Sequence, residues 1–166
     1  MSEEFELSQG KSIGELGREA MWFVAHTLIA IVTLLVMMGI FWMFHPDPDS
    51  PNPKILATVL AFVVPALVGF AIARSTNEIA RYVWISGLLI FSVVCVWVLD
   101  LPTGNGLCEH CGAIEKLYRT FFDINHGSGL MGGDGLFVGT WIPLALIGYA
   151  IGAKFSLDNR DSSSDF

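Results

Sequence analysis

Residues 20–44, AMWFVAHTLIAIVTLLVMMGIFWMF, decide the fold class, because they run without any Asp, Glu, Lys or Arg. At about 1.5 Å of rise per residue, such a helix is about 37 Å long and exceeds the ~30 Å hydrocarbon core of a bilayer. Three further apolar stretches without charge follow at residues 55–73, 82–99 and 135–153. The sequence therefore predicts an all-α integral membrane protein, with four transmembrane helices packed as a bundle.

The composition agrees with this prediction, since 53% of the 166 residues are hydrophobic and only 15% are charged. The longest segment outside the predicted spans is the loop 100–134, which is too short for a large soluble catalytic domain. The formal net charge of −7 offers no basic surface, so a nucleic acid is excluded as a partner. The lipid bilayer is the predicted environment.

The predicted organisation has three parts: an N-terminal cytoplasmic segment, residues 1–19; a transmembrane domain, 20–154; and a disordered cytoplasmic tail, 155–166. Ser12 and Glu15 have capping-box spacing, which predicts a short helix that leads into the first span. The connector 45–54 contains four prolines and is predicted to be a stiff extended loop.

Topology follows from the basic residues, because Lys and Arg near the ends of spans are retained in the cytoplasm. Six of them fall on the side of the termini, against three on the other side, and the short turn 74–81 carries two arginines. This count predicts a multi-pass protein of the plasma (inner) membrane with both termini cytoplasmic. The six are Lys11, Arg18, Arg74, Arg81, Lys154 and Arg160, and the three are Lys54, Lys116 and Arg119.

The outer loop 100–134 contains a short amphipathic pattern. Apolar residues recur at helical spacing, and charged residues occupy the opposite face, where Glu115 and Arg119 are spaced to pair. The pattern predicts a helix between the third and fourth spans that lies in the outer interface or caps the bundle. Its apolar residues are Ile114, Leu117, Tyr118, Phe121 and Phe122.

Cys108 and Cys111 in the same loop allow three interpretations. An oxidising compartment favours a local disulfide that fixes the turn, whereas the two-residue spacing and the nearby helix start also suit a redox-active pair. Two thiolates with His126 as third ligand would suit zinc or copper. His110 lies between the cysteines and would strain such a site, while His45 could approach from the outer end of the first span.

Polar side chains within the spans are few. His26 is the one histidine at membrane depth, so it is either hydrogen-bonded inside the bundle or a ligand to haem iron or a chlorin. The hydroxyls are expected to bond back to their own backbone or across to a neighbouring helix, and Cys95 to pack as a small apolar residue. Without intramembrane charge, ion pumps and coupled transporters are disfavoured.

Paired glycines mark close-approach faces of the fourth span, namely Gly135 with Gly139 and Gly148 with Gly152. These pairs lie on different faces of one helix, so one pair can pack within the bundle while the other contacts another membrane-protein subunit. Packing of both pairs inside the bundle is the simpler interpretation. Together with the absence of a complete catalytic constellation, they predict a non-catalytic accessory or assembly subunit. The alternative is a membrane thiol-disulfide redox or metal-binding protein that uses Cys108 and Cys111.

Overall fold

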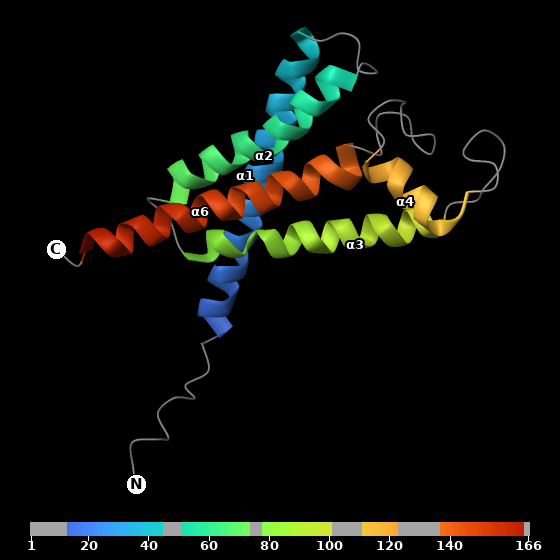
Figure 1. Ribbon diagram of the computed structural model, residues 1–166. Coiled ribbons are helices and arrows are strands. Elements are labelled where there is room, and N and C mark those ends of the chain that lie inside the picture. Colours follow the sequence, from blue (N-terminus) through green and yellow to red (C-terminus); the bar gives the residue numbers. More distant parts are fainter. Residues whose placement is uncertain (1–12, 45–50, 74–77, 101–110, 123–136, 165–166) are drawn as a thin grey trace.

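The computed structural model describes residues 13–44, 51–73, 78–100, 111–122 and 137–164, and no strand occurs in these ranges. Figure 1 shows their arrangement. The elements are α1 (Ile13–Phe44), α2 (Pro51–Ala73), the 3₁₀ segment η1 (Glu78–Tyr82), α3 (Trp84–Asp100), α4 (Ala113–Phe121), the π-helical turn η2 (Phe137–Trp141) and α6 (Ile142–Ser164). Four stretches are long and apolar enough to cross a bilayer, as predicted: Gly14–Phe44, Lys54–Ala73, Ile79–Asp100 and Gly139–Arg160.

Helix α6 is the centre of the fold and lies between α2 and α3 (Figure 1). In its apolar window 61% of the residues are buried, against 22% to 28% in the other three spans. Tyr149, Ala150 and Ala153 of α6 pack with Ala80 and Val83, which belong to and directly follow η1. A helix that is apolar on every side is stable only when neighbours or lipid surround it, and α6 is surrounded mainly by its own chain.

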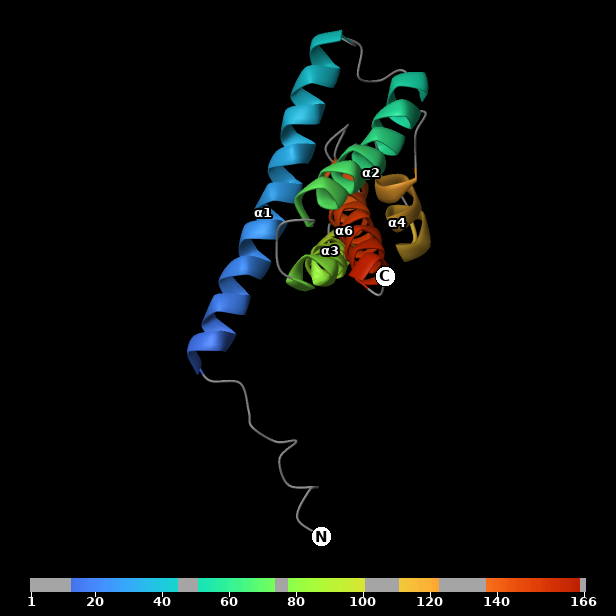
Figure 2. The same ribbon diagram turned by 90° about the vertical axis from the view of Figure 1, so that its left-hand side faces the viewer.

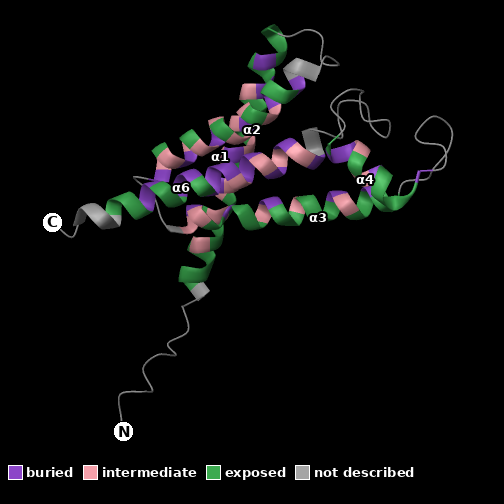
Figure 3. Cartoon of the chain, in the orientation of Figure 1, coloured by how far each residue is buried: buried purple, intermediate pink, exposed green. Residues whose placement is uncertain are grey.

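Helix α1 is attached to this centre along one narrow line and runs across α3 and α6 rather than along them (Figures 1 and 2). Its remaining surface is exposed or only partly covered (Figure 3). The helices therefore splay around α6 and do not form a regular parallel bundle. The buried residues of α1 recur every three or four positions: His26, Ala30, Leu34, Met38 and Phe41.

Two predicted boundaries are wrong. Residues 51–54 form the first turn of α2 instead of extended loop, because the first N–H groups of a helix have no intrahelical partner and proline is tolerated there. Residues 155–164 continue α6 instead of forming a disordered tail, and Leu157 is buried in the same apolar cluster as Ala80 of η1. The expected lead-in helix is confirmed, because the first helix begins at Ile13 and continues without a break into the first span. Ser12, its predicted cap, lies outside the described residues.

Helix α4 confirms the predicted short helix and shows which side faces the bundle. Ile114, Tyr118 and Phe122 are exposed, while Lys116 and Thr120 are buried together with Phe121. The packed face is thus partly polar, which differs from the expected division into an apolar and a wet side. The predicted pair of Glu115 and Arg119 is present, with 2.7 Å between Oε1 and Nη2.

Two polar contacts explain why this mixed face packs inward. Nζ of Lys116 donates to the carbonyl oxygen of Leu99 at 3.3 Å, and the hydroxyl of Thr140 donates to that of Phe121 at 2.9 Å. Both acceptors belong to the last turn of a helix, where carbonyls lack an intrahelical donor. Lys116 thus satisfies a free carbonyl at the end of α3, and Thr140 satisfies one at the end of α4.

Candidate functional site

The polar centre of the membrane-spanning region is a pair formed by His26 of α1 and Tyr149 of α6. Both side chains are completely buried. A hydrogen bond of 2.7 Å joins Nδ1 of His26 to the hydroxyl of Tyr149, and the ring centroids lie 5.8 Å apart. The pair is therefore a polar cross-link between the peripheral helix α1 and the central helix α6.

The second ring nitrogen of His26 is enclosed by protein. Nε2 is buried and has no hydrogen-bond partner, and the ring of Trp22, one turn earlier on α1, lies 5.9 Å away between centroids. A haem or chlorin would need an open face over the ligating nitrogen, so α1 would have to move away for Nε2 to reach one. The packing favours the hydrogen-bonded interpretation of His26, and its role as a cofactor ligand stays a prediction.

Hydroxyls at membrane depth bond either to their own backbone or to a neighbouring helix, which confirms the sequence-based expectation. The Thr140 hydroxyl donates to α4, and the hydroxyl oxygens of Thr27 and Ser86 lie 3.4 Å apart across α1 and α3. Thr33, Thr58 and Ser92 each donate to the carbonyl oxygen four residues earlier at 2.8 Å, and Ser86 donates to that of Val83 at 2.6 Å. A hydroxyl satisfied in this way offers little to a passing ion or substrate. Among the buried hydroxyls of the described spans, that of Ser156 has no hydrogen-bond partner.

The cysteine loop is described only at its end. Cys111 is 9% exposed and directly precedes Gly112, the N-cap of α4, while Cys108, His110, His126 and His45 lie outside the described residues. The predicted disulfide, redox pair and zinc or copper site therefore stay predictions. Within the described ranges, no three His, Cys, Asp or Glu side chains gather as metal ligands. Cys95 is a free thiol packed against Val94 and Val98.

The glycine faces of the fourth span are used inside the chain, so the prediction that they meet a partner subunit is wrong for the three that are described. A Cβ atom at Gly148 would overlap the carbonyl oxygen of Phe62, and one at Gly152 that of Ala66, both on α2. At Gly139 it would overlap the ring of Phe121 on α4. Gly135 lies outside the described residues. The glycines are needed because α2 and α6 approach backbone to backbone.

Sequence reasoning missed Tyr149 as the partner of His26. The available signal was that a tyrosine within an apolar span needs a hydrogen-bond partner when it is buried, and that the spans contain one histidine. No protein-family model, curated protein or solved structure matches this chain.

Proposed function

We propose that this chain is a non-catalytic accessory or assembly subunit of a larger membrane complex, and that α1 is the helix that contacts the partner. The observation that carries this proposal is the one-sided packing of α1. Of its 32 residues only the narrow line from His26 to Phe41 is buried, and its first turns extend beyond the other helices (Figure 2).

One exposed side of α1 is suited to a second helix. We call Leu28, Leu35, Gly39 and Trp42 the outward face; Leu28, Leu35 and Trp42 follow one another at intervals of seven residues. Seven residues make about two helical turns, so these side chains lie above one another. A Cβ atom at Gly39 would find nothing within 4 Å, and such a gap allows a neighbouring backbone to approach closely.

The chemistry of the spans supports a structural role. Transport and proton transfer need ionisable or available polar groups along a path. In the part of the chain that the structure describes, the buried imidazole of His26 is bonded to Tyr149 and enclosed, and the hydroxyls of Thr33 and Thr58 donate to their own backbone. These polar groups stabilise the helices. The exposed surface of the chain is therefore better suited to recognising other proteins than to transport.

We also propose the orientation predicted from the basic residues, with both termini in the cytoplasm and α4 in the outer interface of the plasma membrane. Lys116 holds α4 against the end of α3, which is where a spanning helix leaves the hydrocarbon. At that level Tyr118 and Phe122 are exposed and stack on each other, with 6.1 Å between ring centroids. Exposed aromatic rings are typical of the membrane interface.

Native gel electrophoresis after extraction in a mild detergent tests the proposed function. We expect the tagged chain to migrate with other membrane proteins. Gly39→Leu should reduce the recovered partner about tenfold, which corresponds to roughly 1.4 kcal/mol of binding free energy. Leu89→Phe, at an exposed site on α3, is the matched control and should leave recovery unchanged.

Two results would contradict the proposal. The first is a wild-type chain that migrates alone under every mild extraction condition. The second is a complex that survives Gly39→Leu and a further Leu28→Trp substitution on the outward face, which would show that α1 does not contact the partner.

A further inference from the structure

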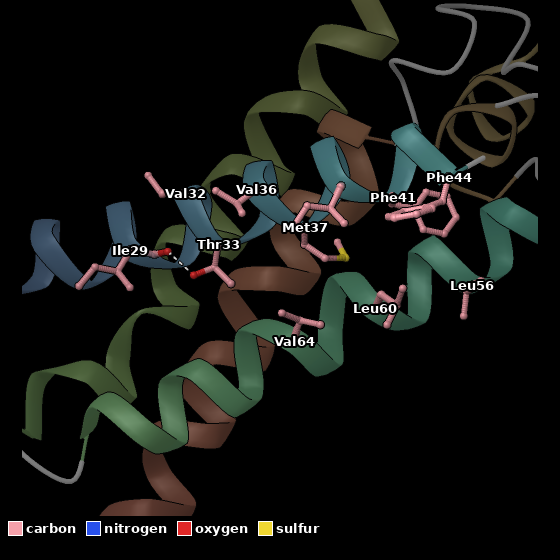
Figure 4. A pocket seen from close by; sticks show the side chains of 11 residues that line it. Ile29, Val32, Thr33, Val36, Met37, Phe41, Phe44, Leu56, Leu60 and Val64 are labelled. Carbon is pink, nitrogen blue, oxygen red and sulfur yellow. Dashed lines mark hydrogen bonds between the residues drawn. The ribbon is translucent and has the colours of Figure 1, made fainter. Parts of the chain in front are cut away.

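A long apolar groove follows the line between α1 and α2 (Figure 4). It has a volume of about 630 Å³ and is lined by residues of these two helices alone. On α1 the lining side chains recur every three or four residues from Ile29 to Phe44, a distance of about 22 Å at 1.5 Å per residue. On α2 they are Leu56, Leu60 and Val64, one turn apart.

The groove offers no polar group to an occupant. Its one polar side chain is Thr33, whose hydroxyl donates to the carbonyl oxygen of Ile29 at 2.8 Å, as the dashed line in Figure 4 shows. The remaining lining side chains are aliphatic, aromatic or, at Met37, a thioether. A ligand that carries amide, hydroxyl or charged groups would lose hydrogen bonds to water and gain none here. The occupant must therefore be hydrocarbon.

The lining also distinguishes between a transmembrane helix and a flexible chain. Helices that dock in membranes meet through small residues, and the α2–α6 contact in this protein shows the pattern, with Gly69, Gly148 and Gly152 facing backbone of the opposite helix. The groove contains no glycine, alanine or serine. Its bulky and branched side chains keep a second backbone at a distance, whereas an acyl chain can bend to follow them.

We propose that the groove between α1 and α2 binds one acyl chain of a membrane phospholipid, from the leaflet that holds the Phe44 end of α1. The groove is about 22 Å long, whereas one leaflet is ~15 Å deep, half of a ~30 Å hydrocarbon core. An acyl chain from one leaflet therefore fits along the groove. The lipid then completes the contact between α1 and α2. This site is on a different side of α1 from the outward face, so the lipid and the partner helix do not compete.

Native mass spectrometry of the purified full chain tests this inference, with dioleoyl phosphatidylcholine as the added lipid. We expect one phospholipid to remain bound per chain. The double substitution Val36→Phe and Leu60→Phe fills the groove and should lower the bound fraction about tenfold. The double substitution Val24→Phe and Leu89→Phe adds the same bulk at exposed sites outside the groove and should leave the bound fraction unchanged.

A photo-cross-linking measurement on the wild-type chain keeps the test valid even if the groove variant unfolds. Phosphatidylcholine with a diazirine on one acyl chain should label peptides from the middle of α1 and of α2 more strongly than those of α3. Equal labelling of all exposed helices would overturn the inference, as would equal lipid retention in the two double variants. A mass of two chains that disappears on filling the groove would instead identify a second copy as the occupant.

Discussion

The hydrogen bond between His26 and Tyr149 links α1 to α6, which also share an apolar cluster. Tyr149→Phe removes this bond and leaves both imidazole nitrogens without a partner in a buried site. An unpaired buried polar group costs about 1 to 3 kcal/mol, although such bonds in membrane proteins average nearer 1 kcal/mol or below. We expect Tyr149→Phe to lower the free energy of unfolding by about 1 kcal/mol, as measured by denaturant titration in mixed micelles.

The double variant His26→Leu with Tyr149→Phe is the control for this residue prediction. Replacing both partners by apolar groups leaves no unsatisfied donor or acceptor, so we expect stability nearer to the wild type than in the single variant. Equal stability of wild type and Tyr149→Phe would show that the bond does not hold α1. A visible absorption band of the purified protein that is lost in His26→Leu would identify His26 as a pigment ligand.

Between elements, the contact of α2 with α6 depends on the absence of side chains at Gly69, Gly148 and Gly152. Gly152→Ala places a methyl group onto the carbonyl of Ala66, and overpacking of this kind costs about 1 to 3 kcal/mol. We expect a lower unfolding midpoint for Gly152→Ala and an unchanged or slightly higher midpoint for Gly39→Ala, where the added Cβ meets nothing. Equal effects of the two substitutions would show that α2 and α6 do not approach this closely.

For the whole molecule, the proposed topology places residues 101–110 and α4 on one side of the membrane and both termini on the other. A phosphatase active only outside the cytoplasm should be active when fused after residue 105. A fluorescent protein that folds only in the cytoplasm should report at either terminus. Phosphatase activity at the C-terminus, combined with none at residue 105, would invert the topology and remove the basis for an oxidised Cys108 and Cys111.

The length and apolarity of the spans, together with the helical spacing of residues 114–122, were sufficient to predict the four membrane helices and α4. These features are local, because a backbone in lipid must satisfy its hydrogen bonds within one helix. The helical end of α6 was missed because local features of the sequence carry no information about contacts with distant segments. Residues 155–164 are polar enough to suggest a tail, and their helix is supported by the apolar cluster that Leu157 shares with Ala80 of the distant segment η1.

By itself, the sequence determined that this chain has four stretches long and apolar enough to cross a membrane as helices, with one imidazole among them. Only the tertiary structure decided which helix faces which. Every face of a membrane helix is apolar, so hydrophobic patterning cannot tell the side that meets Gly148 from the side that meets lipid. Packing of backbone against backbone assigned the glycines to the contact between α2 and α6. The same packing brought Tyr149 to His26 and left one side of α1 uncovered.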